Sequence, residues 1–244
     1  MMNISKERKR SLKTYQLSSK NDFIYYLYQL VCRCYKVLNQ QDKYLAELYS
    51  YINNAQRKQV LKKSSYINVP HDDYKNFLSL LSSSETTLLN IIGDMQGSSL
   101  SYYKFRDLIY KKKKRKQLDF DLPDLDSDIL NILKEFNKSR NFQNHVPESL
   151  ICAEKLLIEE QNLKEIQYNP IKIVNYEYCT LEFLNDLYES YKNQTIGAYI
   201  IFDNMKADYE LLIGEKLIIE DVYSIKIKGL DHLEAVKFAH ELQY

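Results

Sequence analysis

An arginine, an asparagine and a histidine stand close together in the chain at Arg140, Asn141 and His145. Their side chains match the needs of RNA cleavage by the RNA's own 2′-hydroxyl, in which protons must move and the phosphorane charge must be neutralised. A histidine that titrates near neutrality can transfer a proton. An arginine can hold two phosphate oxygens, and an asparagine can donate to phosphate or fix the imidazole tautomer. This segment is the candidate catalytic site.

The spacing of Arg140 and His145 leaves that site incomplete in one copy of the chain. On a regular helix a step of five residues rotates by about 500°, which separates the two side chains by roughly 140°. A single histidine also supplies only one proton-transfer group. Either the helical turn is broken or a second chain completes the site.

The segment resembles the Arg-x4–6-His motif of the HEPN superfamily, helical-bundle proteins of toxin–antitoxin, abortive-infection and CRISPR-associated systems. The preferred form of that motif has a polar residue directly after the arginine, which here is Asn141. The resemblance implies a metal-independent endoribonuclease that needs no cofactor and acts as a homodimer, with two motifs in one cleft. It assigns phosphate stabilisation to Arg140, phosphate positioning to Asn141 and proton handling to His145.

The same resemblance implies a role as a toxin or in antiviral defence, with RNA as substrate and an antitoxin or regulatory protein as a further partner. It covers the motif and a helical context over residues 20–164. Pro147 is a departure from the family pattern, because it indicates a helix that starts after the motif. The alternative reading places Arg140 and His145 on the surface at an interhelical turn. In the catalytic interpretation neither is expected in the core, so that substitution of Arg140 or His145 should abolish cleavage and leave folding intact.

The charge is divided unevenly along the chain. Residues 1–118 hold 22 Lys and Arg against 9 Asp and Glu, a net +13, whereas residues 119–244 hold 12 against 24, a net −12. A basic half favours an anionic partner such as nucleic acid. The candidate nucleic-acid-binding residues form one run: Lys111, Lys112, Lys113, Lys114, Arg115 and Lys116. The alternatives are that the two halves pair with each other or with a second copy, as in a non-catalytic binding or protein-interaction module.

Few glycines and prolines and long periodic stretches predict a mainly α protein. We expect a basic flexible arm over 1–20, a HEPN-like helical bundle over 21–164, and a small α/β appendage of unknown role over 165–244. The first helix is expected to be capped by Asn21 or Asp22, with one apolar face from Phe23 to Ile52. Seven tyrosines are expected to widen its buried stripe: Tyr25, Tyr26, Tyr28, Tyr35, Tyr44, Tyr49 and Tyr51.

Further helices are expected to start at Pro70, near Ser101, at Asp126 or Ser127, and at Pro147. In the appendage the pattern predicts strands over 171–174 and 217–228 and helices from Thr180 and over 231–242. Residues 198–202 fit a helix or a strand.

Several classes of protein are disfavoured by the sequence. No stretch is apolar enough for a membrane span and the start is no secretory signal, so a soluble cytoplasmic protein without a membrane partner is expected. The four cysteines lack partners at zinc spacing, and no metal site is expected. No P-loop or serine-hydrolase motif is present. His71 is expected near a helix cap, and His232 and His240 are expected at an interface or on the surface.

Overall fold

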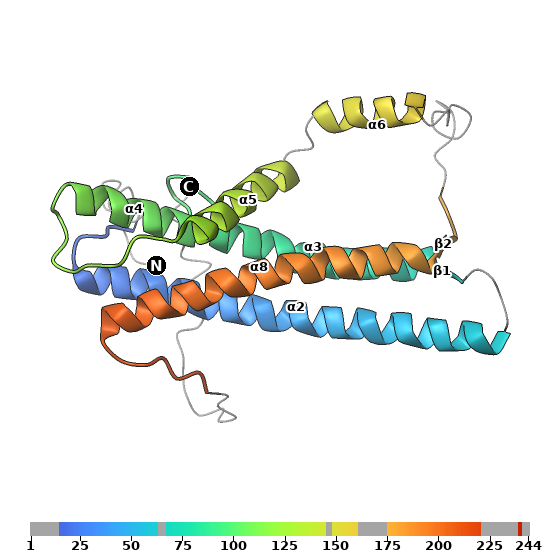
Figure 1. The fold of residues 1–244 in the computed structure, drawn as a ribbon, viewed down its shortest axis with the longest axis horizontal. Coiled ribbons are helices and arrows are strands. Elements are labelled where there is room, and N and C mark those ends of the chain that lie inside the picture. Colours follow the sequence, from blue (N-terminus) through green and yellow to red (C-terminus); the bar gives the residue numbers. More distant parts are fainter. Residues whose placement is uncertain (1–14, 63–66, 145–147, 161–174, 221–238, 241–244) are drawn as a thin grey trace.

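The computed structural model describes residues 15–62, 67–144, 148–160, 175–220 and 239–240. Figure 1 shows long helices lying side by side, with one shorter helix standing apart from them. The helices are α2 (Lys20–Lys62), α3 (His71–Gly93), α4 (Tyr102–Lys114), α5 (Ser127–Asn144), α6 (Glu148–Glu160) and α8 (Leu181–Ile213). Two three-residue strands, β1 (Asn68–Pro70) and β2 (Tyr178–Thr180), pair antiparallel. The predicted mainly α class with a small strand-containing part is confirmed.

Helix α2 carries the apolar face that the sequence predicts. From Phe23 to Ile52 the residues at helical spacing are buried, and they pack against α3, α4 and α8. The predicted cap was wrong by a few residues, because α2 already begins at Lys20. Ser19 precedes it, and the Asp22 carboxylate accepts hydrogen bonds from the Ser19 backbone N–H (2.7 Å) and hydroxyl (2.9 Å). Asp22 therefore lies in the first turn and closes it onto Ser19.

The tyrosines of α2 divide between the core and the surface. Tyr26 is buried, and three others are half-buried: Tyr35, Tyr44 and Tyr51. The remaining three are exposed, against expectation: Tyr25, Tyr28 and Tyr49. A tyrosine has an apolar ring and a polar hydroxyl. It can therefore lie at the edge of a helix contact, with the ring against the neighbouring helix and the hydroxyl in water.

Helix α8 lies antiparallel along α2 and shares its core. Ring contacts join Tyr28 to Tyr209 and Tyr49 to Tyr188, so the two helices run in opposite directions. Thr180 starts α8 as predicted, and the stretch over 198–202, which fitted helix or strand, is helical. The helix ends at Gly214, whose φ of 81° is the left-handed conformation that favours glycine.

The predicted boundary at residues 164 and 165 lies outside the described residues, as do the strand expected over 171–174 and most of the terminal helix. Of the strand expected over 217–228, residues 217–220 are described and are not in a strand. Of the arm expected over 1–20, residues 1–14 lie outside the described residues, whereas Leu17 is buried in the core and Lys20 already belongs to α2. Helix α8 lies beyond the predicted boundary. Its buried side chains belong to the same bundle core as those of α2, α3 and α5, so residues 181–213 are part of that core.

A layer of polar side chains separates the two parts of the core. One part lies beside the first half of α2, from Phe23 to Leu38, and the other beside the stretch from Leu45 to Ile52. Between them lies Gln41, whose Oε1 accepts a short hydrogen bond from the Ser84 hydroxyl of α3. Thr195 of α8 is also buried, and its hydroxyl donates to the backbone of Tyr191.

Helix α5 approaches α3 closely and antiparallel. A Cβ added at Gly93 would lie 2.7 Å from the backbone nitrogen of Asn137, so this contact requires a glycine. The Asn137 side chain donates to the Gly93 carbonyl at 2.6 Å, and the Thr86 hydroxyl donates to Gln143 at 3.2 Å. These contacts fix the end of α5 that carries the candidate motif.

Helix α6 follows the motif and stands apart from the bundle in Figure 1. The sequence predicts this helix, and three of its large apolar side chains are exposed. They are Ile151 (61%), Leu156 (58%) and Leu157 (54%). No helix within the described residues is long and apolar enough to cross a membrane.

Candidate functional site

The last turns of α5 place Arg140 and Asn141 on a regular helix that continues to Asn144. His145 and Pro147 lie outside the described residues, so the position of the histidine relative to the arginine stays a prediction. The next described residue, Glu148, starts α6, which agrees with a new helix after the motif.

Arg140 is fastened to α3 by its guanidinium. Its Nη2 lies 3.2 Å from Oδ2 of Asp94, and its Nε donates to Oδ1 of Asn90 at 3.3 Å. Its Nη1 donates to Oδ1 of the neighbouring Asn141 at 3.2 Å. The Arg140 side chain is only 11% exposed and that of Asp94 only 10%. The alternative that places Arg140 on the surface does not fit this arrangement, because a carboxylate 46 positions earlier holds the side chain in the α3–α5 contact.

This arrangement leaves Arg140 with some capacity for a ligand. A guanidinium has five N–H groups, of which Asn90, Asp94 and Asn141 take one each, so about two remain. Asn141 is exposed, and its Nδ2 donates weakly to Oδ1 of Asn137 at 3.4 Å. The pair thus presents N–H donors of fixed orientation at the end of α5, while Asp94 offsets much of the arginine's charge.

The basic run divides into engaged and free side chains. Lys113 binds the acidic segment over residues 119–126, with its Nζ 2.9 Å from Asp121 and 3.5 Å from Asp124. The hydrogen bond to Asp121 is the main cause that raises the pKa of Lys113. Lys111 pairs with Asp107 at 2.6 Å. This part agrees with the alternative in which basic and acidic segments pair with each other.

The remaining cations of the run are available to a partner. Lys114 lies over the ring of Tyr110, with its Nζ 4.3 Å from the ring centroid. The side chains of Lys112, Arg115 and Lys116 form no ion pair among the residues that the structure describes. Lys116 has a φ of 54°, the left-handed conformation that ends α4.

A buried polar cluster in α4 and α8 was missed by sequence reasoning. Arg106 of α4 is 7% exposed, and its Nη1 lies 3.0 Å from Oδ2 of Asp208, which is 5% exposed. The hydroxyl of the fully buried Tyr102 donates to the same Asp208 oxygen at 2.6 Å, and burial raises the Tyr102 pKa well above its ordinary value. Arg106 and Asp208 are separated by 102 positions, so no local spacing could have indicated the pair.

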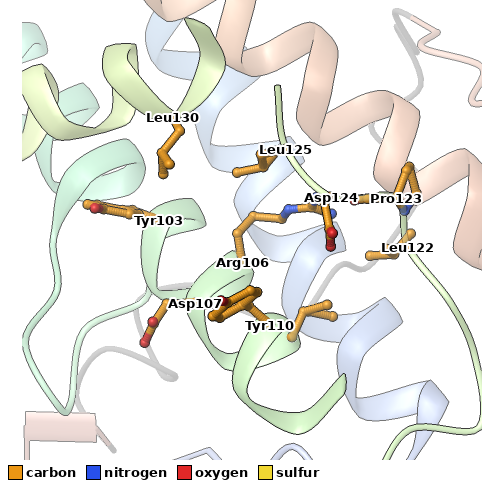
Figure 2. Close-up of a pocket in the computed structure, with 10 residues that line it drawn as sticks. Tyr103, Arg106, Asp107, Tyr110, Leu122, Pro123, Asp124, Leu125 and Leu130 are labelled. Carbon is orange, nitrogen blue, oxygen red and sulfur yellow. Dashed lines mark hydrogen bonds between the residues drawn. The ribbon is translucent and has the colours of Figure 1, made fainter. Parts of the chain in front are cut away.

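A pocket of about 420 Å³ opens beside this cluster. Figure 2 shows side chains of α4 on one side of it and residues of the acidic segment and α5 on the other. On α4 the lining residues recur at helical spacing: Tyr103, Arg106, Asp107 and Tyr110. That spacing is the one sequence signal that could have placed them on a common face.

The histidine and cysteine positions that the structure describes show no further constellation. His71 begins α3, as expected for a residue near a helix cap, and its Nδ1 lies 2.9 Å from the Tyr176 carbonyl oxygen. The four cysteines are free. Among the described residues, no group of three or more His, Cys, Asp or Glu side chains comes together as a metal site. His232 lies outside the described residues.

Comparisons with protein-family models, curated proteins and solved structures find no match for this chain. The fold by itself defines a mainly α helical bundle.

Proposed function

We propose that this chain is a metal-independent endoribonuclease of the HEPN type, acting as a homodimer in a toxin or phage-defence role. One observation carries the proposal. Arg140 is held near the end of α5 by contacts to Asn90 and Asp94, and it donates to Asn141 beside it, four residues before His145 in the chain. A phosphate-binding pair of this kind has to be preorganised, because donors that need not reorient stabilise developing charge best.

Each residue of the motif has a separate role in this proposal. Arg140 stabilises the negative charge of the phosphorane through the N–H groups that its α3 partners leave free. Asn141 donates to a second phosphate oxygen, and His145 transfers the proton. A second copy contributes the second histidine, which allows one imidazole to take the 2′-hydroxyl proton while the other protonates the leaving 5′-oxygen.

Asp94 adds a positioning role that the motif alone does not contain. It fixes the plane of the Arg140 guanidinium, and its negative charge reduces the pull of the site on ground-state phosphate. The proposal therefore expects weak RNA binding at the motif itself, with most affinity supplied by basic residues elsewhere.

The test is cleavage of a mixed-sequence RNA by the purified full chain in EDTA. We expect cleavage with 2′,3′-cyclic phosphate ends that His145→Ala abolishes and that Asn141→Ala reduces by about a hundredfold. His240→Ala, a change of the same type outside the motif, serves as the matched control. Equal cleavage by the parent and His145→Ala would show that Arg140, Asn141 and His145 are not the active centre. Absence of cleavage by a folded dimer would contradict the proposed activity.

A second candidate function is favoured by the Arg140–Asp94 ion pair. A nearly buried arginine with a carboxylate partner is also what a purely structural contact requires. In that case the chain is a non-catalytic helical module that binds nucleic acid through the basic residues of its N-terminal half. Salt-sensitive RNA binding that survives His145→Ala, without cleavage, would support this function over the first.

A further inference from the structure

We infer that the pocket between α4, the acidic segment and the start of α5 binds a nucleotide, with the base inside and the phosphate at the end of α4. The inference extends the nucleic-acid part of the proposed function and does not require the chain to cleave RNA. It rests on the shape of the pocket, on the buried arginine in its wall and on the cation at its edge.

The walls of the pocket suit a flat aromatic ring. Tyr103 and Tyr110 project from α4, and apolar side chains face them from the other side in Figure 2. These apolar residues are Leu122, Pro123, Leu125 and Leu130. Aromatic and apolar walls favour a base because every base has a π face that can stack. A volume of about 420 Å³ lies in the range, roughly 300–1,000 Å³, of small-molecule sites.

Arg106 gives this apolar pocket a fixed polar group. Its Nη1 binds Asp208, and its Nη2 donates to the Pro123 carbonyl oxygen, so the guanidinium cannot swing away. These bonds leave part of its five N–H groups for a ligand in the pocket. Because Asp208 offsets the charge, Arg106 is suited to a neutral acceptor such as a base carbonyl or ring nitrogen, and less to a phosphate.

The phosphate is placed by the cations at the end of α4. The face that carries Tyr103, Arg106 and Tyr110 continues one turn later at Lys114, whose Nζ lies 4.3 Å from the Tyr110 ring centroid. A base stacked near Tyr110 would thus have its phosphate beside an ammonium group. Arg115 follows directly in the chain.

The acidic residues at the edge do not oppose a phosphate, because each has a lysine partner. Asp107 pairs with Lys111 at 2.6 Å, and Asp124 lies 3.5 Å from Lys113. Lys113 also donates to the Leu122 carbonyl oxygen at 3.3 Å, which fixes the acidic segment as the second wall of the pocket. The charge of each carboxylate is thus offset by its lysine, and the Lys113 contacts hold the acidic segment against α4.

The pocket is also within reach of the candidate motif. Leu130 lines the pocket and Arg140 lies ten residues further along α5, a separation of about 15 Å at 1.5 Å per residue. A single RNA strand could place one base in the pocket and a phosphate a few nucleotides further along the strand near Arg140. The same pocket could equally take a free mononucleotide, which shares the base and phosphate.

Calorimetric titration of the full-length His145→Ala protein distinguishes these sources without cleavage. The probes are adenosine and uridine 5′-monophosphate, the two nucleosides without phosphate, and a short single-stranded oligoribonucleotide. The test variants are Tyr110→Ala and Lys114→Gln. Tyr110 is 50% exposed, so its removal leaves the core intact. The matched controls are Tyr25→Ala, since Tyr25 is 52% exposed on another helix, and Lys36→Gln.

We expect nucleotide binding that Tyr110→Ala weakens at least about fivefold, the lower end of what loss of base stacking costs. Lys114→Gln should lower the dependence of oligonucleotide binding on salt by about 0.7 in the logarithmic slope. The two controls should bind as the His145→Ala parent does. Binding of mononucleotides identifies a free nucleotide as a ligand, and binding of the oligonucleotide alone identifies a nucleotide within RNA.

Absence of binding by every probe would overturn the inference. So would equal weakening by Tyr110→Ala and Tyr25→Ala, because binding would then not involve the pocket. An affinity for nucleosides equal to that for nucleotides would overturn the phosphate-binding role given to Lys114. Failure of RNA cleavage leaves these results unaffected, so the pocket and the proposed catalytic site are tested separately.

Discussion

Arg140 near the end of α5 and Asp94, the residue that follows α3, form an ion pair with Nη2 and Oδ2 3.2 Å apart. Both side chains are nearly buried. The residue proposed to stabilise the phosphorane thus also joins two helices of the bundle. This double role decides how the site can be tested, because loss of activity in an Arg140 variant need not be a catalytic effect.

Arg140→Ala should destabilise the protein by about 3 kcal/mol, because it leaves Asp94 nearly buried without its cation. The free energy of unfolding is measured by urea denaturation. Asn141→Ala, a change at the adjacent and more exposed position, should stay within about 0.5 kcal/mol of the parent. An Arg140→Ala protein as stable as the parent would show that the ion pair contributes nothing to the fold.

Gly93→Ala should destabilise the contact between α3 and α5. The added Cβ would lie 2.7 Å from backbone atoms of Phe136 and Asn137, so one helix has to move. Overpacking of this kind costs about 1–3 kcal/mol, which thermal or urea unfolding can measure. Gly97→Ala is the control, since nothing lies within 4 Å of a Cβ there. Equal stability of the two variants would contradict the close approach.

Gln41→Leu should stabilise the bundle. The Nε2 of Gln41 is buried without a hydrogen-bond partner, which costs about 1–3 kcal/mol. Ser84 would not be left unpaired by the change, because its hydroxyl also bonds to the Leu81 carbonyl oxygen at 2.9 Å. We expect a gain of about 1 kcal/mol in the free energy of unfolding. A loss of stability would instead show that the amide is needed between the two parts of the core.

Removing the free cations at the end of α4 should reduce RNA binding in a salt-dependent way. Replacing Lys112, Arg115 and Lys116 together by Gln should lower the logarithmic salt slope by about 2, at roughly 0.7 per contact with a single strand. Lys113→Gln is the comparison, because Lys113 is already bound to Asp121 and Asp124. Binding measured between low and moderate salt tests this. An unchanged slope in the triple variant would exclude these residues from the interface.

The contribution of Asp22 to the stability of the first turn of α2 should decrease in acid. Hydrogen bonds from Ser19 and Ser18 to the Asp22 carboxylate lower its pKa below the ordinary value of 3.8. Its contribution to stability is therefore present above that value and is lost as the pH falls through the lowered pKa. The stability difference between the parent and Asp22→Asn should be larger at about pH 7 than at about pH 2.5. A difference independent of pH would show that the ionised carboxylate is not the stabilising form.

Local sequence patterns were enough to predict several features of the fold. The apolar face of α2, the start of α8 after Thr180 and the helices on both sides of the motif follow from helical periodicity and from residues that begin or end helices. Such signals depend only on residues within one or two helical turns of each other in the sequence. The three-residue strands β1 and β2 were not predicted at their positions, because so short a strand carries no measurable period.

The contacts between side chains that are distant in the chain could not be predicted from local patterns. Arg140 and Asp94 are 46 positions apart, and Arg106 and Asp208 are 102 apart. In both cases the packing of the helices determines which carboxylate faces the arginine. Nothing in the sequence around either arginine indicates which of the chain's acidic residues that will be. The long-range packing therefore turned an expected surface arginine into a link between α3 and α5, and it built a pocket around an arginine that the sequence did not single out.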